Sequence, residues 1–394
     1  MSHIDRTKPK VLMVTTSFPV GPNKASGIFV KRLASALSDQ VTLTVLTPGS
    51  YDQVETDVDY QIKCFRYAPY KWQRLAHEPG GIFVALRTNR WLVLLLPIFV
   101  LALFVGVVLH GRKADIIHAN WSVTGFIAGL AALLIGKPVI TTLRGTDVSS
   151  IRQSAISRLL TGMTLRLSRL IVAVSETIAN ELRQLWPERA RDVFVVPNGV
   201  EESLLALKSI QKKEGLVVTT IGNLIPLKDV ATIIRAIPNV MKNTQLRVIG
   251  EGVERAALEN LSHELGVAEQ VAFIGAIPPE NIKKELSMTD IFVLSSHSEG
   301  RPNVILEAMA AGCAIISSDL PGVRELIDED VSGLFFEPGD VSALSHHLER
   351  LIENEQLRSK LGLNARSRII DMELTWPMCG ARYVGLYNSL LELH

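Results

Sequence analysis

Short apolar runs alternate with amphipathic segments along most of the chain. A run that is apolar throughout is typical of a strand buried on both faces, and the amphipathic segments between such runs then serve as helical crossovers. The pattern therefore predicts an α/β protein with a doubly wound sheet, formed twice in succession. The predicted strands are 11–16, 41–46, 115–118, 139–143, 170–174 and 193–196 in the first half, and 217–221, 245–249, 270–274, 291–294, 314–317 and 333–336 in the second.

A turn signal at residues 197–199, Pro-Asn-Gly, separates the two halves. We predict an N-terminal domain over 1–200 and a second domain over 201–372, which suits a chain of 394 residues. The segment 373–394 carries apolar residues at helical spacing, and we expect it to pack back on the N-terminal domain. Two such domains facing each other would leave a cleft at the carboxyl ends of their strands, where α/β sheets bind ligands.

The segment 91–109 contains no charged residue, and Arg90 and Arg112 lie at its two ends. Its length would suffice to cross a bilayer, but a crossing would place half of the first sheet on each side. Two other interpretations are a helix dipping into a membrane interface between basic anchors and an internal helix of the domain. We predict membrane surface contact on the cytoplasmic side, with a kink at Pro97.

Composition excludes several other classes. The formal net charge of +1 provides no global field that would attract nucleic acid. Cys64, Cys313 and Cys379 are far apart in the sequence and form no CxxC or Cys/His cluster, so we expect neither a disulfide framework nor a zinc site. We expect the protein to work in a reducing compartment. The polar N-terminus leads us to expect no secretory signal.

The strongest chemical signal is the segment from Glu299 to Glu307, which follows the predicted strand 291–294. Pro302 suits the first position of a helix, and a helix start reached through a glycine loop favours an anion such as phosphate. Carboxylates repel phosphate but accept hydrogen bonds from hydroxyl groups. The segment thus predicts a ligand with both phosphates and sugars; the alternative is an ordinary capped helix with solvated acids.

Two further signals follow predicted strands. Lys228 follows the strand 217–221 and lies at a helix start, where a cation is unfavourable for the dipole unless an anion is bound. The alternative is a solvated lysine. Gly27 follows the first strand and would let the backbone approach a ligand closely. The GxGxxG fingerprint of dinucleotide enzymes is absent there, which argues against a dehydrogenase.

Weaker signals lie at other strand ends. Arg144 and Asp147 follow the strand 139–143, where the arginine would hold a phosphate or carboxylate, or pair with a surface acid. His118 is interpreted as structural rather than catalytic. The D-x-D triplets at 57–59 and 328–330 have the spacing of a metal site, but neither clearly ends a core strand, so we interpret both as solvated loops.

Taken in order along the chain, these residues resemble glycosyltransferase family 4, which has the GT-B fold of two Rossmann-like doubly wound domains facing across a cleft. The resemblance covers nearly the whole chain and is most specific at the two glutamates separated by seven residues. It is carried by Gly27 with Phe29, the motif at 144–147, the motif at 174–176, the motif at 196–200, Gly222 to Leu224 with Lys228, the motif at 250–252, the motif at 273–275, and Glu299 to Glu307.

The resemblance implies a retaining transferase whose donor is a nucleoside diphosphate sugar, UDP- or GDP-linked. In such an enzyme Glu307 would bind the ribose, Glu299 would contact the transferred sugar, and Lys228 would neutralise the diphosphate. The implied donor-binding residues are Gly27, Asn223, Lys228, Gly275, Gly300, Arg301, Pro302, Asn303 and Glu307, and the implied catalytic residues are Glu299, Arg144 and Asp147.

By the same resemblance the enzyme needs no metal or other cofactor, and its acceptor is a glycan or a lipid-linked molecule in polysaccharide or glycolipid synthesis. No nucleic acid partner is expected, and the enzyme would lie peripherally on the inner face of the cell membrane. Three residues depart from the family pattern: Asn223 replaces a common Arg, Arg144 a common His, and Arg301 a common aromatic residue. The alternatives are a GT-B sugar-nucleotide epimerase, a non-catalytic sugar-nucleotide-binding protein and an integral membrane subunit.

Overall fold

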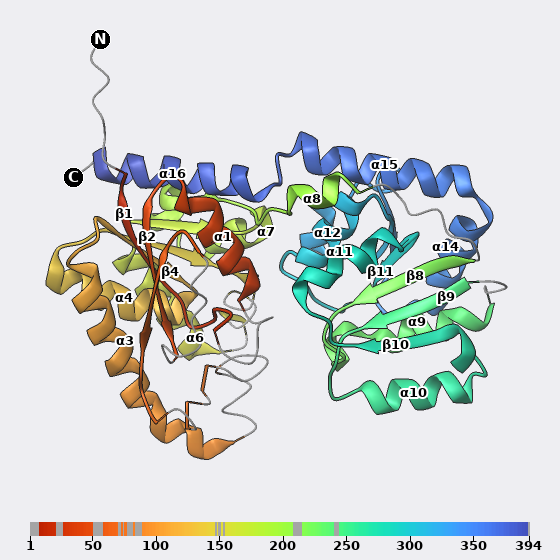
Figure 1. Cartoon of the computed structure of the whole chain (residues 1–394), viewed down its shortest axis with the longest axis horizontal. Helices are drawn as coiled ribbons and strands as arrows, with labels where there is room; N and C mark the ends of the chain where they lie inside the picture. Colours follow the sequence, from red (N-terminus) through yellow and green to blue (C-terminus); the bar gives the residue numbers. More distant parts are fainter. Residues whose placement is uncertain are drawn as a thin grey trace, which may run out of the picture. The chain divides into compact units, whose positions relative to one another are not determined.

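The chain folds into two compact units, each an open sheet with helices on both faces (Figure 1). Unit 1 comprises Met1–Asn198 together with Trp376–His394, and unit 2 comprises Gly199–Thr375. The computed structural model describes residues 8–20, 27–49, 58–69, 72–73, 75–76, 82, 89–145, 148, 151–152, 154–207, 215–239 and 244–392.

The sheet of unit 1 is parallel throughout, with the strand order β3-β2-β1-β4-β5-β6-β7. The chain winds outward from β1 to β3, then returns to β4 and winds in the opposite direction, so the order reverses between β1 and β4. Ligands of such sheets bind outside the carboxyl ends of the strands at this switch point. The strands are β1 (Lys10–Val14), β2 (Thr42–Pro48), β3 (Gln61–Phe65), β4 (Ile116–Asn120), β5 (Val139–Leu143), β6 (Leu170–Ala173) and β7 (Val193–Val195).

Helices cover the two faces of this sheet because alternate strand residues point to opposite sides. Val11 and Met13 of β1 pack with α1 and α16, whereas Leu12 and Val14 pack with α3 and α4. The helices are α1 (Ile28–Ser38), η3 (Arg90–Leu95), α3 (Leu96–Gly111), α4 (Ser122–Ile135), α6 (Ala155–Leu167), α7 (Glu176–Leu185), η4 (Pro187–Asp192) and α16 (Trp376–Glu392).

The C-terminal helix α16 is part of the core of unit 1. Its residues Tyr383 and Tyr387 are fully buried, and a network of hydrogen bonds ties both to the sheet. The Tyr387 hydroxyl lies 2.7 Å from Nδ1 of His118, and Nε2 of His118 lies 2.8 Å from Oγ1 of Thr142, which lies 2.9 Å from the Tyr383 hydroxyl. Complete burial, together with the nearby charge of Arg144, lowers the pKa of His118 to about 3.

This buried histidine predicts a loss of stability in mild acid. Below about pH 6.5 the unfolded chain binds a proton at His118 while the folded chain keeps the imidazole neutral, so the free energy of unfolding falls as pH falls. We expect a loss of about 2 kcal/mol between about pH 6.5 and pH 5 from this group. Urea unfolding of wild type and His118→Gln at several pH values measures it; equal pH slopes for the two would contradict the prediction.

The apolar segment predicted as one helix is divided between η3 and α3. Pro97 lies in the first turn of α3, directly after the junction with η3, and the kink expected there stays a prediction. Among the described residues this one helical stretch, Arg90–Gly111, is long and apolar enough to cross a membrane, and 28% of its most apolar window is buried. Phe99 and Leu103 face the sheet, whereas outward residues such as Leu101 are exposed.

The sheet of unit 2 is also parallel, in the order β10-β9-β8-β11-β12-β13, and its switch point lies between β8 and β11. The predicted α/β class with two doubly wound sheets is therefore confirmed. The strands are β8 (Leu216–Ile221), β9 (Thr244–Ile249), β10 (Val271–Gly275), β11 (Ile291–Leu294), β12 (Ala314–Ser318) and β13 (Leu334–Phe336).

Separate apolar cores on the two faces of this sheet fix its helices. One core joins α9, α10 and α14 to the strands, and the other joins α8, α12 and α15. The helices are α8 (Glu202–Leu205), η5 (Pro226–Lys228), α9 (Val230–Ala236), η6 (Ile237–Asn239), α10 (Arg255–Glu264), η7 (Ala268–Gln270), α11 (Pro279–Ser287), α12 (Asn303–Ala311), α13 (Pro321–Arg324), α14 (Val341–Glu353) and α15 (Glu355–Asp371).

Candidate active site

The two strongest sequence signals meet at the switch point of unit 2. Lys228 ends η5 after β8, and Glu299 lies in the loop between β11 and α12. Their side chains form an ion pair, with 22% and 14% of their surface exposed. The same Glu299 oxygen, Oε1, accepts a hydrogen bond of 2.8 Å from the Ser296 hydroxyl. Lys228 lies just before the next helix, which begins at Val230, and the dipole of a helix start disfavours a cation there. In the protein alone, the carboxylate of Glu299 compensates the charge of Lys228.

Hydrogen bonds between the two loops hold this pair in place. The Ser295 hydroxyl donates to the carbonyl of Lys228 at 2.9 Å, and the amide of His297 donates to the carbonyl of Leu227 at 2.9 Å. The Ser318 hydroxyl at the end of β12 donates to the carbonyl of Ser296 at 2.7 Å. Three neighbouring strand ends therefore fix the backbone on either side of the charged pair.

Helix α12 begins beside Glu299. It starts at Asn303 with Pro302 as its N-cap, one residue later than the sequence pattern predicts. Ile305 and Leu306 anchor the first turn in the core. Asn303 and Glu307 are partly exposed on one side of the helix, four residues apart, and Gly300 in the preceding loop is partly exposed as well. The first turn of a helix presents amide N–H groups that have no partner within the helix.

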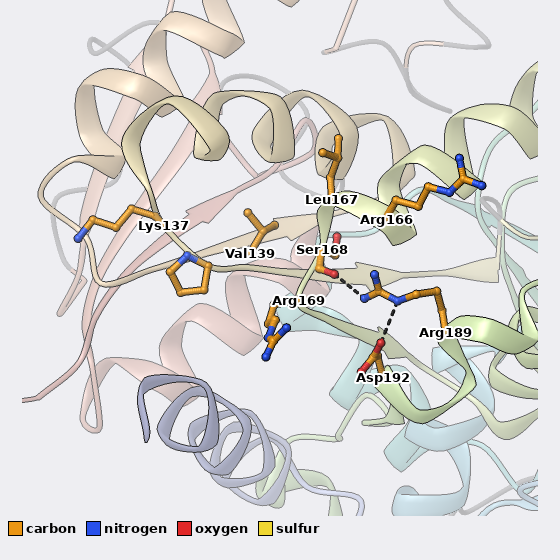
Figure 2. A pocket seen from close by; sticks show the side chains of 9 residues that line it. Lys137, Val139, Arg166, Leu167, Ser168, Arg169, Arg189 and Asp192 are labelled. Carbon is orange, nitrogen blue, oxygen red and sulfur yellow. Dashed lines mark hydrogen bonds and ion pairs between the residues drawn. The ribbon is translucent and has the colours of Figure 1, made fainter. Parts of the chain in front are cut away.

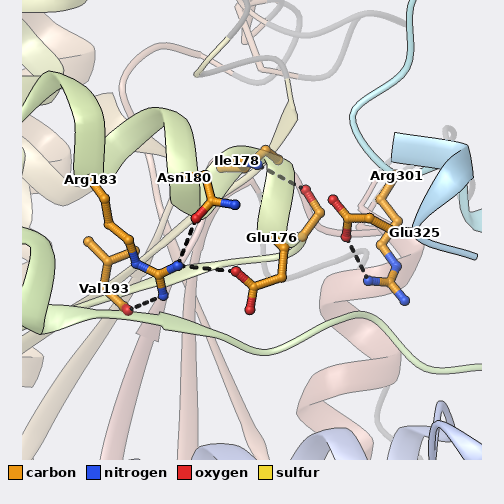
Figure 3. Close-up of polar contacts among 8 residues, drawn as sticks. Glu176, Ile178, Asn180, Arg183, Val193, Arg301 and Glu325 are labelled. Carbon is orange, nitrogen blue, oxygen red and sulfur yellow. Dashed lines mark hydrogen bonds and ion pairs between the residues drawn. The ribbon is translucent and has the colours of Figure 1, made fainter. Parts of the chain in front are cut away.

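The side chain of Arg301 turns into unit 2. It is 4% exposed, and its Nη1 lies 3.5 Å from Oε2 of Glu325 (Figure 3). Next to it, a Cβ added to Gly322 would lie 1.9 Å from the carbonyl oxygen of Gly300, so the start of α13 abuts the turn that carries Arg301. Glu325 is therefore a partner of this arginine.

Glycines bring the ends of β8, β9 and β10 close together. Gly250 has a φ of +141°, and a Cβ there would lie 1.8 Å from the carbonyl oxygen of Gly222. The amide of Gly250 donates to the carbonyl of Gly275 at 2.9 Å, and that of Gly222 donates to Ile249 at 2.9 Å. Asn223, the next residue, is exposed. Gly275 has a φ of +81° and lies against the carboxylate of Glu251.

In unit 1, Gly27 serves the fold itself. Its φ is +74°, and a Cβ there would lie 2.2 Å from the carbonyl oxygen of Ser17. Gly27 is thus close to the backbone after β1 where α1 begins, and its approach to a ligand stays a prediction.

Arg144 is held inside unit 1 at the carboxyl end of β5. It is 6% exposed, and its two terminal nitrogens each donate a hydrogen bond of 3.0 Å, one to Oδ1 of Asn198 and one to Oδ1 of Asn120. Its guanidinium carbon lies 4.4 Å from the centre of the Phe29 ring, at cation–π distance. Arg144 is thus buried rather than at the surface. Asp147 lies outside the described residues.

Trp121 is a candidate site residue that the sequence does not single out. It follows β4 with φ +70° and ψ 155°, a conformation that costs a non-glycine residue free energy and is found mainly at functional sites. Its ring packs edge-on against Phe29 at 6.0 Å, and the Arg144 guanidinium lies 5.9 Å from it. The predicted strand 115–118 ends two residues before β4 does, so Asn120 and Trp121 did not stand out as strand-end residues.

The motif at 174–176 has a structural role. Ser175 caps α7 by accepting a hydrogen bond of 3.2 Å from the amide of Ile178. Glu176 pairs with Arg183 at 3.1 Å, and Arg183 also donates to the carbonyl of Val193 (Figure 3). The motif thus joins α7 to β7.

The second D-x-D triplet is engaged in ion pairs. Asp328 pairs with Arg368 and Asp330 with Arg350. Asp57 of the first triplet lies outside the described residues. Within the part of the chain that the structure describes, no group of three or more His, Cys, Asp and Glu residues is placed to hold a metal ion.

Comparisons with known proteins indicate the family of the chain. Two family models match the chain: "Glycosyltransferase Family 4" over residues 26–204 and "Glycosyl transferases group 1" over residues 206–368. The chain is 26% identical to N-acetyl-alpha-D-glucosaminyl L-malate synthase of Bacillus anthracis, over 80% of this chain and 85% of that protein. It is 25% identical to an Escherichia coli UDP-Gal:alpha-D-GlcNAc-diphosphoundecaprenol alpha-1,3-galactosyltransferase, over 67% and 72% of the two chains.

Among solved structures, Anabaena HepE in complex with UDP superposes with a TM-score of 0.77 at 19% identity, covering 96% of this chain and 100% of that one. This likeness shows the two-domain GT-B fold. Together the two family models account for nearly the whole chain. The chain therefore belongs to glycosyltransferase family 4.

Proposed function

We propose that this glycosyltransferase is a retaining, metal-independent enzyme that transfers a sugar from a UDP- or GDP-sugar to a glycan or lipid-linked acceptor. The observation that carries the proposal is the Lys228–Glu299 pair beside the start of α12. An ammonium group and a helix N-terminus together favour a diphosphate, and the neighbouring carboxylates of Glu299 and Glu307 favour sugar hydroxyls.

In this proposal, binding of the donor breaks the ion pair between Lys228 and Glu299 and gives each side chain a new partner on the donor. The diphosphate approaches Lys228 and the amides at the start of α12, and Glu299 then accepts a hydrogen bond from a hydroxyl of the transferred sugar. Glu307, four residues after Asn303 on α12, binds the ribose hydroxyls. Negative charge that develops on the leaving diphosphate is stabilised by Lys228 and the amides at the start of α12, whose positions the loop hydrogen bonds already fix. Stabilisation of developing charge by such preorganised groups is usually the largest contribution to catalysis.

The acceptor class is inferred from relatives. The Escherichia coli relative is named for a diphosphoundecaprenol-linked acceptor, and the HepE structure contains UDP. By analogy, we propose that the acceptor of the present chain is a lipid-linked molecule or a glycan in cell-surface polysaccharide or glycolipid synthesis.

We also propose that the enzyme is peripheral on the inner face of the cell membrane. The outward residues of η3 and α3 include Leu94, Ile98 and Leu101, which are 66%, 52% and 62% exposed. Arg90 and Arg112 lie at the ends of this apolar stretch, as expected for a helix lying in a membrane interface.

The proposed function is tested by a thermal-shift screen of nucleoside diphosphate sugars, followed by transfer to lipid-linked acceptors. A ligand present well above its dissociation constant raises the unfolding temperature measurably. We expect one donor to stabilise the protein in the presence of a chelator, and NMR of the product to show the anomeric configuration of the donor. Interconversion of the donor without acceptor would instead identify an epimerase, and binding without any reaction would identify a non-catalytic protein.

A further inference from the structure

Basic side chains that the proposed transfer reaction does not use line one pocket at the amino-terminal edge of the sheet in unit 1, with Lys137 at one end and Arg166 at the other (Figure 2). Lys137 lies just before β5, Arg166 lies in the last turn of α6, and Arg169 lies just before β6. Together with Arg189 they line an open pocket of about 210 Å³, which also contains Asp192. Residues far apart in the sequence meet here because the amino ends of neighbouring parallel strands lie side by side.

Most of the positive charge in this pocket is uncompensated. Arg189 is occupied, since it pairs with Asp192 at 2.8 Å and donates to the carbonyl of Ser168 at 2.6 Å. By contrast, Lys137, Arg166 and Arg169 form no ion pair with any residue in the described part of the chain. Arg166 and Arg169 are exposed and Lys137 is partly exposed, so all three are accessible to a ligand.

Apolar surface adjoins the pocket. Helices α4 and α6 pack so closely that a Cβ added to Gly129 would lie 2.6 Å from Cβ of Leu167. Leu133 follows Gly129 by one turn towards Lys137, and Leu133 and Leu134 are 69% and 70% exposed. A second pocket of about 310 Å³ shares Arg166 with the first and continues along α6 past Leu159, which is 65% exposed.

We propose that this pocket binds the phosphate of an anionic phospholipid headgroup, with the acyl chains against the exposed leucines of α4 and α6. Phosphate complements three uncompensated cations, and arginine and lysine are the usual phosphate ligands. The adjoining leucines select a phosphate that carries apolar chains over a free one. The inference rests on the proposed membrane contact, but the site is distinct from the donor residues Lys228, Glu299 and Glu307: it lies at the amino ends of β5 and β6, whereas these three lie in unit 2.

The test compares two triple variants of the full-length protein. In the first, Lys137, Arg166 and Arg169 are each changed to Gln. In the control, the exposed residues Arg235, Lys283 and Lys284 of unit 2 are each changed to Gln, which removes the same charge elsewhere. Both are sedimented with vesicles of phosphatidylcholine alone and of equal parts phosphatidylcholine and phosphatidylglycerol.

A basic residue near an anionic membrane strengthens binding about five-fold, so the pocket variant should bind the phosphatidylglycerol vesicles on the order of 100-fold more weakly than wild type. The control variant should lose much less of its affinity for the phosphatidylglycerol vesicles. Equal losses in the two variants, or wild-type binding that does not depend on phosphatidylglycerol, would overturn the proposal.

Two further measurements separate the possible sources of phosphate and the two proposals. A thermal shift with inorganic phosphate that is lost in the pocket variant, with vesicle binding unchanged, would mean a free-phosphate site and overturn the lipid assignment. Nucleotide binding by the pocket variant should equal that of wild type. If wild type binds vesicles through this pocket but binds no sugar nucleotide, the proposed donor site fails while the lipid site stands.

Discussion

Replacing Lys228 with alanine should weaken donor binding by about 1.5–3 kcal/mol, or roughly ten- to hundred-fold in dissociation constant, because a charge-assisted hydrogen bond to the diphosphate is lost. The ion pair adds to this effect. Without Lys228, the carboxylate of Glu299, which is 14% exposed, has lost its ion-pair partner beside the place where the diphosphate would lie. Isothermal titration with the donor found in the thermal-shift screen measures the change.

Matched variants show whether the loss belongs to this site. Lys283→Ala removes a charge from an exposed position in unit 2 and should leave the donor affinity unchanged. Glu307→Ala should weaken binding of the nucleotide by a similar 1.5–3 kcal/mol, about the value of a hydrogen bond to a charged group. If both Lys228→Ala and Glu307→Ala keep the wild-type donor affinity, the assignment of the donor site is wrong.

The second large effect is expected at Gly250. Alanine there must adopt a φ of +141° and would place its Cβ 1.8 Å from the carbonyl oxygen of Gly222, so the ends of β8 and β9 must move apart. Backbone strain and overpacking each cost about 1–3 kcal/mol, which gives an expected loss of about 2–6 kcal/mol in the free energy of unfolding. Donor affinity should fall too, because the loop from Gly222 leads to Lys228.

Gly266 provides the control for this prediction. It has a φ of +69°, but a Cβ there would meet nothing within 4 Å. Gly266→Ala should therefore cost only the strain of the left-handed conformation, about 1–2 kcal/mol. Urea unfolding of both variants separates strain from steric overlap, and equal losses for Gly250→Ala and Gly266→Ala would show that the overlap is relieved without cost.

Local patterns in the sequence are sufficient to predict much of the fold. A strand that is buried on both faces needs a continuous apolar run, and a crossover helix needs an apolar stripe, so both are visible within a short window. The same holds for turns and helix starts, which is why the Lys228 and Glu299 loops stand out. Their order along the chain was enough to indicate the glycosyltransferase family.

Side-chain partners depend on which strands become neighbours. Asn120 and Asn198 reach Arg144 because β4 and β5 are adjacent and the turn after β7 returns to the same unit. Arg301 pairs with Glu325, and Lys228 with Glu299, across loops from different strands. No local pattern encodes such pairs, because they follow from sheet order.

The sequence by itself determined the α/β class, the two repeated sheets, the apolar segment near residue 100 and the position of the loops predicted to bind an anion, because each depends on residues close together in the chain. Only the tertiary structure decided that Glu299 neutralises Lys228, that Arg144 is buried between two asparagines, and that Lys137, Arg166 and Arg169 form one basic pocket. Parallel pairing of distant strands brings these groups together, and that pairing is a property of the folded chain as a whole.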